Sequence, residues 1–280
     1  MNKNKVVLAG AGTMGASLAQ VYAQAGWDTV LWNRSAAGLE RAKSLISLNQ
    51  ATFIKEGILV EVESNAMLSR IRMTTDKADY QDAALVVESI VEKLDAKQAF
   101  WEEISALVPA EALLATNTSG LKITEIAKAC KHPERFMGQH WLNPPHLLPL
   151  CEIIAGEQTA PENVQKMRTL VKNLGKQPVV VADINGFIIN RIQFALLREA
   201  LHIVDIGAAT VEDVDTALKA GMGLRYAALG PFGVADFGGL DTFDHINSYL
   251  NAELDDSKVG NKRLHEMVAV SYTHLTLPTT

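Results

Sequence analysis

Residues Lys5–Gly15 read KVVLAGAGTMG, a short apolar run that leads directly into the pattern G-x-G-x-x-G. With a strand before it and a helix after it, this turn binds the pyrophosphate of a dinucleotide at the helix N-terminus. Gly10 allows the tight turn, Gly12 lets a phosphate approach the backbone, and Gly15 lets the helix pack closely on the strand. The alternative is a glycine-rich turn with a purely structural role. The stretch predicts dinucleotide-binding residues at Gly10, Gly12, Thr13, Met14 and Gly15.

The composition is that of an ordinary globular protein with a sizeable core, since 48% of the 280 residues are hydrophobic and 21% are charged. This length suggests about two domains. The formal net charge of -6 argues against nucleic acid or an anionic membrane as the main partner. No apolar run approaches the ~20 residues of a membrane-spanning helix, and we expect no signal sequence, because the start Met1–Lys5 contains no apolar signal core. Cys130 and Cys151 match no metal-ligand spacing, so we expect reduced thiols, no metal site and a cytoplasmic protein.

The first part of the chain alternates strand-like and helix-like segments, which indicates a parallel sheet with helices on both faces. The predicted strands are Lys5–Ala9, Thr29–Trp32, Ile71–Thr74, Leu85–Glu88, Leu113–Thr116, Phe136–His140, Leu150–Ile154 and Pro178–Ala182. The predicted helices are Thr13–Ala25, Ala36–Leu48, Lys93–Leu107 and Glu162–Leu174, with a helical excursion off the sheet within Gln50–Ser69. The expected fold class is α/β, with a Rossmann-type doubly wound parallel sheet in the N-terminal domain.

The pattern changes at Asp183–Gly186, after which the chain reads as all-helical. Thr210 occupies a cap position with Asp213 three residues later, a pairing that starts helices. The predicted helices are Phe187–Ile206, Val211–Ala220, Leu240–Leu254 and Val259–Val268. The sequence therefore predicts a dinucleotide-binding domain over residues 1–183 and an all-α C-terminal domain over residues 184–280.

Asn33 and Arg34 follow the second predicted strand, where sites that prefer NAD usually carry an acidic residue for the ribose 2′-hydroxyl. An asparagine does not repel a 2′-phosphate, and a guanidinium can bind one through two hydrogen bonds. The cofactor is therefore expected to be NAD or NADP, with these two residues favouring NADP. Arg34 as a solvated residue at a helix start is the alternative.

Polar side chains are concentrated between Asn117 and Glu152, around predicted strand ends that face the ligand crevice of an open parallel sheet. His140 ends one strand and Glu152 lies on the next strand-like run. A carboxylate that holds one imidazole nitrogen fixes the tautomer and stabilises the imidazolium, which suits a general base. Oxidation of a hydroxyl to a ketone needs such a base, because the alcohol loses a proton as the hydride leaves. A histidine buried for structural reasons remains the alternative.

Several further segments, in order along residues 5–268, resemble the L-3-hydroxyacyl-CoA dehydrogenase family. They are Val87–Lys97, Asn117–Ser119, Gly138–Pro144, Cys151–Ile154, Gly186–Arg191, Gly230–Gly233 and Gly239–Asp241. The resemblance implies NAD(P)-dependent interconversion of an L-3-hydroxyacyl-CoA and its 3-ketoacyl form, in fatty acid metabolism. It also implies a homodimer formed through the helical C-terminal domain.

Carried over residue by residue, the resemblance gives His140 as the general base and Glu152 as the carboxylate that orients it. Ser119 and Asn190 would hydrogen-bond the substrate oxygen. Asn143 would lie by the nicotinamide, and Ser119 would contact the cofactor as well. Two more cofactor contacts, near the ribose and pyrophosphate, are implied for Glu92 and Lys97; a solvated pair at a helix start is the other reading of these two residues.

Two segments depart from the family pattern. Gly223–Ala227 looks more like the branch with L-gulonate and L-carnitine dehydrogenases, where Arg225 would pair with a free substrate carboxylate or bind carbonyls at a helix end. The same chemistry on a small hydroxy acid without CoA is therefore an alternative function. The segment 270–280 matches nothing in the family and reads as a non-native end. That end favours a third reading, a dinucleotide-binding protein without turnover.

Overall fold

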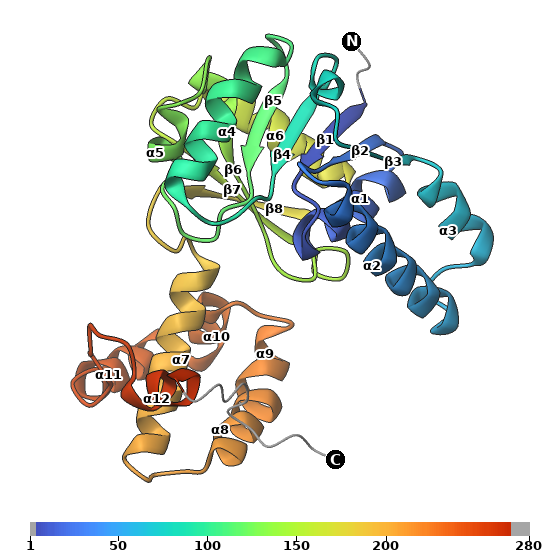
Figure 1. The fold of residues 1–280 in the computed structure, drawn as a ribbon. Helices are drawn as coiled ribbons and strands as arrows, with labels where there is room; N and C mark the ends of the chain where they lie inside the picture. Colours follow the sequence, from blue (N-terminus) through green and yellow to red (C-terminus); the bar gives the residue numbers. More distant parts are fainter. Residues whose placement is uncertain (1–3, 270–280) are drawn as a thin grey trace. The chain divides into compact units, whose positions relative to one another are not determined.

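A computed structural model describes residues 4–269 of the chain, which divide into two compact units between Asn190 and Arg191. The first unit contains the whole sheet, and the second is helical (Figure 1). This division falls after the turn at Asp183–Gly186, so the first residues of the long helix that follows this turn belong with the sheet.

The first unit is built on one eight-stranded sheet with the order β3-β2-β1-β4-β5-β6-β7-β8. Its strands are β1 (Lys5–Ala9), β2 (Asp28–Trp32), β3 (Ile71–Thr74), β4 (Leu85–Glu88), β5 (Leu113–Thr116), β6 (Phe136–Trp141), β7 (Leu150–Ala155) and β8 (Gln177–Ala182). Every pairing is parallel except β6 with β7, which is antiparallel. A parallel crossover needs a dozen or more residues, and the connection from Trp141 to Leu150 is too short for one. The Rossmann-type doubly wound fold class is confirmed, and β7 and β8, which are parallel to each other, run opposite to the other six strands.

Helices cover both faces of the sheet, and alternate residues of β1 show the two layers. Val6 and Leu8 belong to one buried cluster, with α1, α2 and α6, whereas Val7 and Ala9 belong to the other, with α4 and α5. The helices of this unit are α1 (Thr13–Gln24), α2 (Ala36–Lys55), α3 (Glu61–Leu68), α4 (Leu94–Leu107), α5 (Ile123–Ala127) and α6 (Pro161–Asn173), with 3₁₀ turns at Lys77–Tyr80 and Pro133–Arg135.

The helical excursion predicted within Gln50–Ser69 is the end of α2 together with α3. The end predicted for α2 at Leu48 is wrong, because the helix continues to Lys55. Gln50 is buried rather than solvated, and its amide nitrogen donates to Gln20 Oε1 at 2.8 Å. The Ser64 hydroxyl of α3 donates to Gln50 Oε1 at 2.9 Å, so contacts distant in sequence stabilise a polar stretch as helix.

The second unit contains helices in all of its described secondary structure. They are α7 (Ile189–Asp205, which starts in the first unit), α8 (Val211–Ala217), a π-helical turn (Leu218–Gly223), α9 (Leu224–Tyr226), α10 (Pro231–Gly238), α11 (Leu240–Leu250) and α12 (Lys262–Ala269). The Thr210 hydroxyl accepts from the Asp213 amide at 3.1 Å, which is the cap expected for α8. Helix α10 was not anticipated in its glycine-rich stretch; Pro231 begins it at a first-turn position that suits proline.

Between residues 4 and 269, no helix combines the length and the apolar character that crossing a membrane requires. The segment 270–280, for which the sequence predicts a non-native end, lies outside the described residues.

Candidate active site

The glycine-rich turn connects β1 to α1, and each of its glycines meets different surroundings. A Cβ on Gly15 would lie 1.8 Å from the Gly10 carbonyl oxygen, so the close packing of α1 on the turn requires a glycine there. Gly10 has a φ of 107°, and a Cβ on it would lie 2.5 Å from the Ser89 carbonyl oxygen. By contrast, nothing lies within 4 Å of the Cβ position on Gly12. Of the three glycines in this turn, Gly12 is therefore the one that faces open space.

The N-terminus of α1, which follows Gly12, is suited to an anion. No side chain caps it, and its first turn holds no acidic residue. The first N–H groups of a helix have no partner within the helix and carry the positive end of its dipole. The open space at Gly12 and these amides at Thr13 and Met14 fit a dinucleotide pyrophosphate.

At the end of β2, Asn33 holds the loop to the glycine-rich turn. Its Oδ1 accepts from the Ala11 amide at 3.3 Å, while its Nδ2 donates to the Ser35 carbonyl at 3.0 Å. The Arg34 side chain next to it is exposed and makes no hydrogen bond or ion pair within residues 4–269. Asn33 therefore shapes the loop, and Arg34 is the cation that remains available beside it.

Asn117 connects the carboxyl ends of three parallel strands. Its backbone amide donates to the Glu88 carbonyl at 2.7 Å, and its side-chain amide donates to Ser89 Oγ at 3.3 Å. Its Oδ1 accepts from the Trp141 amide at 3.1 Å. These bonds hold the ends of β4, β5 and β6 together on the side of the sheet where ligands bind in such folds.

His140 and Glu152 are cross-strand partners in the antiparallel pair of β6 and β7. The imidazole Nδ1 lies 2.7 Å from Glu152 Oε2, and both side chains are almost fully buried. An ionised carboxylate only accepts hydrogen bonds, so Nδ1 carries the proton and Nε2 is left as an acceptor. Neutral imidazole in this tautomer is competent to accept a proton at Nε2.

The second oxygen of Glu152 accepts from two backbone amides, those of Ile188 at 2.9 Å and Ile189 at 3.1 Å, where α7 begins. Burial by itself raises the pKa of Glu152, but the hydrogen bonds from His140 and from the two amides outweigh burial. The pKa of this carboxyl therefore lies below its ordinary value, and the group is ionised at neutral pH.

The turn that presents those amides has two consecutive residues in the left-handed region, Gly186 at φ 77° and Phe187 at φ 50°. This conformation is unfavourable for a bulky residue such as phenylalanine. Phe187 is fully buried, and its ring centroid lies 5.4 Å from that of His140. It therefore packs directly on the candidate base, a contact that the sequence reading did not anticipate.

The remaining predicted substrate residues, and Asn143, which is predicted to contact the cofactor, divide between the two units. Ser119 follows β5 and is exposed, and its carbonyl accepts from the Asn190 side-chain amide at 2.7 Å. Asn143 follows β6 in an exposed position. Arg225 is exposed on α9 in the second unit. The structure thus joins Ser119 to Asn190 directly.

Glu92 and Lys97 lie beside a buried glutamate that the sequence reading missed as a site residue. Lys97 is fully buried, with its ammonium 2.6 Å from Glu88 Oε1 and 3.3 Å from Glu92 Oε2. Glu92 in turn accepts from the Ser119 amide at 2.9 Å. A glutamate that ends the apolar run of β4, nine residues before a lysine at the start of a helix, is the signal that points to Glu88.

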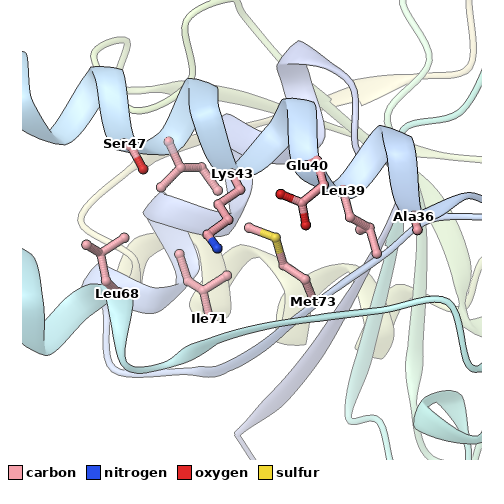
Figure 2. Close-up of a pocket in the computed structure, with 9 residues that line it drawn as sticks. Ala36, Leu39, Glu40, Lys43, Ser47, Leu68, Ile71 and Met73 are labelled. Carbon is pink, nitrogen blue, oxygen red and sulfur yellow. The ribbon is translucent and has the colours of Figure 1, made fainter.

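An open pocket of about 450 Å³ lies between α2 and the edge strand β3. Figure 2 shows Lys43 and Glu40 of α2 on one side of it, with Ile71 and Met73 of β3 on the other. None of the predicted site residues lines this pocket. Within residues 4–269, no group of three or more His, Cys, Asp or Glu side chains is arranged to hold a metal ion.

Known proteins match both units. The chain matches the family model "3-hydroxyacyl-CoA dehydrogenase, NAD binding domain" over residues 5–184. The model "3-hydroxyacyl-CoA dehydrogenase, C-terminal domain" follows over residues 186–274. The second match includes the first residues of the segment 270–280, so the expectation that this segment matches nothing in the family is wrong for residues 270–274.

Relatives with known names cover most of the chain. It is 37% identical over 253 residues to the 5-formyl-3-hydroxy-2-methylpyridine 4-carboxylate 5-dehydrogenase of Mesorhizobium japonicum, covering 90% of this chain and 81% of the relative. It is 38% identical over 254 residues to a 3-hydroxybutyryl-CoA dehydrogenase of Bradyrhizobium diazoefficiens, covering 91% of this chain and 86% of that one. A crystal structure of the first kind of enzyme, an NAD+-dependent dismutase, superposes with a TM-score of 0.88 at 36% identity, covering 96% of this chain and 86% of that one.

Proposed function

The chain belongs to the 3-hydroxyacyl-CoA dehydrogenase family, and we propose that it interconverts an L-3-hydroxyacyl-CoA and the 3-ketoacyl-CoA by hydride transfer. The observation that carries this proposal is the 2.7 Å contact between His140 and Glu152 at the ligand side of a dinucleotide-binding sheet. Curated relatives named 3-hydroxybutyryl-CoA dehydrogenase, at 38% identity, support the acyl-CoA substrate.

In the proposed mechanism, His140 accepts the proton of the substrate hydroxyl at Nε2, because Glu152 holds the proton of the ring at Nδ1. The buried carboxylate then stabilises the imidazolium. A bound nicotinamide supplies the hydride acceptor. In the reverse direction, the imidazolium returns the proton to the ketone oxygen.

Ser119 and Asn190 are the proposed contacts to the reacting oxygen. The Ser119 hydroxyl makes no hydrogen bond within residues 4–269, so it is available to a substrate. Asn190 uses its amide nitrogen on the Ser119 carbonyl, and that nitrogen has a second hydrogen to donate. The mutual contact would keep both groups on one side of the substrate. We also assign Asn143 to the nicotinamide end of the cofactor.

For the cofactor, the family supports NAD, and we propose that Arg34 lets the enzyme accept NADP as well. Asn33, in the place of an acidic residue, brings no negative charge against a 2′-phosphate. The exposed guanidinium of Arg34, which has no hydrogen-bond or ion-pair partner among residues 4–269, supports this proposal, since it can bind a phosphate through two hydrogen bonds.

A second candidate function is the same hydride transfer on a small carboxylate without CoA. The 37% identical relative is named for a pyridine carboxylate, which is a substrate of this kind. Arg225, exposed on α9, would pair with the substrate carboxylate in this case.

The test is the change in nicotinamide absorbance with NADH and NADPH, each against acetoacetyl-CoA, free acetoacetate and a pyridine aldehyde carboxylate. Turnover of acetoacetyl-CoA at a kcat/KM at least tenfold above the free acids supports the first function. The reverse order supports the second. Dinucleotide binding without turnover of any of the three would reject both in favour of a non-catalytic protein.

We further propose a homodimer formed through the second unit. Phe232, Phe237 and Leu240 are exposed there, at 85%, 83% and 64% of their surface, on α10 and α11. Exposed apolar clusters of this kind mark association surfaces. Light scattering of the purified protein gives the subunit number directly. A cytoplasmic location and a role in fatty acid metabolism stay predictions.

A further inference from the structure

The turn that leads into α7 holds a bulky residue in a backbone conformation that disfavours it. Phe187 has a φ of 50°, and Gly186 before it has a φ of 77°. Glycine adopts this left-handed region freely, whereas a phenylalanine there is an outlier that only its surroundings can hold in place. Strained residues of this kind are concentrated at functional sites. The strain at Phe187 therefore points to contacts on which the site depends.

The strained turn contacts both members of the His140–Glu152 pair. The next two backbone amides, those of Ile188 and Ile189, donate to Glu152 Oε1 at 2.9 and 3.1 Å. The ring of Phe187 lies against His140, with the ring centroids 5.4 Å apart and the ring planes at 56° to each other. A right-handed conformation at Phe187 would turn the ring and these amides in other directions. One strained residue therefore sets the contacts to the base and to its carboxylate.

The Phe187 ring encloses the imidazole from the interior of the domain. Phe187 is 0% exposed and His140 is 3% exposed, so the part of the imidazole that the ring covers is closed to water. Two rings at this distance and tilt make a favourable aromatic contact. The hydrogen bond to Glu152 restrains the imidazole at Nδ1 alone, and its other ring atoms depend on packing for their position. The phenyl ring supplies that second restraint.

We propose that Phe187 is a positioning residue for the base: its ring holds the His140 imidazole so that Nδ1 stays on Glu152 and Nε2 stays directed at the substrate hydroxyl. The left-handed backbone is the conformation that brings the ring to this place. The effect of Phe187 on turnover rests on the proposed function, whereas its effect on the imidazole does not.

Phe187→Ala and Phe187→Gly both remove the ring, but only the glycine also relieves the backbone strain. Phe187→Gly should therefore melt no lower than Phe187→Ala, although alanine is the more stabilising residue at ordinary backbone angles. Phe136→Ala is the matched control. Phe136 lies on the same strand as His140, belongs to the same buried cluster as Phe187 and is also 0% exposed, but its ring packs on Trp101 at 5.0 Å. Where alanine prevents folding, Phe187→Leu and Phe136→Leu are compared in the same way.

The first readout is the ¹⁵N NMR spectrum of the His140 imidazole, recorded where the ring is neutral and assigned with His140→Gln. The wild type should show one protonated and one unprotonated ring nitrogen, because Glu152 fixes one tautomer. In Phe187→Ala and Phe187→Gly the two resonances should move towards each other as the tautomers mix, and in the control they should stay in place.

The second readout is kcat with the best substrate. It should fall about tenfold or more, and equally, in the two variants without the ring, since small displacements of a reacting group are this costly. It should stay near the wild-type value in Phe136→Ala. The NADH dissociation constant should stay within about twofold of wild type in all of them, because Phe187 acts on the base and not on the dinucleotide turn.

A purely structural role for Phe187 predicts a different order. In that case kcat would follow thermal stability, so Phe187→Gly would be more active than Phe187→Ala, and Phe136→Ala would lose as much activity as either. That order, or an unchanged imidazole spectrum in both Phe187 variants, would overturn the proposal. A lower melting temperature for Phe187→Gly than for Phe187→Ala would overturn the strained placement of the ring. If the wild type turns over no substrate, the proposed function fails, but the imidazole spectrum still decides the role of Phe187.

Discussion

Replacing Glu152 with glutamine should inactivate the enzyme by reversing the tautomer of His140. The wild-type carboxylate accepts three hydrogen bonds, two on Oε1 from the Ile188 and Ile189 amides and one on Oε2 from His140. Glutamine has one oxygen and one NH₂ group. The two backbone amides cannot become acceptors, so the oxygen must face them and the NH₂ group must face the imidazole.

The imidazole adapts by moving its proton from Nδ1 to Nε2, and the acceptor that takes the substrate proton is then gone. General-base catalysis supplies about 10²–10⁴-fold, so kcat should fall by about that factor. All three hydrogen bonds persist in neutral form, so stability should fall by only about 1–3 kcal/mol, the difference between charged and neutral hydrogen bonds. That loss is small beside the ~5–15 kcal/mol of a typical domain, and the variant should fold.

The assay is steady-state kinetics at saturating cofactor for Glu152→Gln, His140→Gln and the double variant, with thermal unfolding as the check on folding. Because the two residues act as a unit, the double variant should be about as slow as the slower single variant. Cofactor affinity should stay near the wild-type value, since neither residue belongs to the dinucleotide turn. A Glu152→Gln enzyme that retains more than about a tenth of wild-type kcat would refute the tautomer reasoning, and fully additive losses would show two separate functions.

Three further predictions concern other parts of the first unit. Arg34→Ala should weaken NADPH binding by about 1.5–3 kcal/mol and leave NADH binding nearly unchanged in a fluorescence titration; equal losses for both would exclude a 2′-phosphate contact. Gly15→Ala should lower the free energy of unfolding by at least ~1–3 kcal/mol, because its Cβ would lie 1.8 Å from a carbonyl oxygen. Gly12→Ala should have the melting temperature of the wild type but bind both NADH and NADPH more weakly. The hydrogen bond from Arg72 lowers the pKa of Asp79 from its ordinary 3.8 to about 2, so this pair stabilises the fold above pH ~4 and the stabilisation is lost as the pH falls towards 2. In Asp79→Asn, the free energy of unfolding should fall by about 1 kcal/mol less between pH ~4 and 2 than in the wild type. This figure is small because Arg72 is half exposed. An unchanged pH dependence would exclude the pair as a source of acid sensitivity.

The sequence predicted the sheet well because local signals and tertiary structure agree there. Each strand has an apolar run, and the glycine-rich turn has a local reason for each of its glycines. The reversed direction of β7 was not predicted, although it places Glu152 directly opposite His140. The sequence predicts His140 and Glu152 on neighbouring strands, but only the antiparallel register places them directly opposite each other.

What the sequence could not predict depends on burial. The sequence predicts Lys97 as a cofactor contact but not its burial, because nothing local says that a lysine will be enclosed with Glu88 in the core. Phe187 reads as one more apolar residue of a helix, yet it adopts a left-handed conformation and packs on His140. A buried charge or a strained backbone persists only when many distant contacts support it, and those contacts are absent from any local pattern.

Glu92 and Glu152 use the same arrangement in two places at the site. Each gives one oxygen to a side chain with a nitrogen donor, Lys97 or His140, and the other to backbone amides of a segment that carries a proposed substrate contact. Glu92 binds the amide of Ser119 itself, and Glu152 binds the two amides just before Asn190. The orientation of each carboxylate is therefore coupled to the position of the backbone segment that it binds, which carries Ser119 for Glu92 and Asn190 for Glu152. Substitutions of Glu152 should for this reason change turnover more than dinucleotide affinity, since the turn at Gly12 does not depend on it.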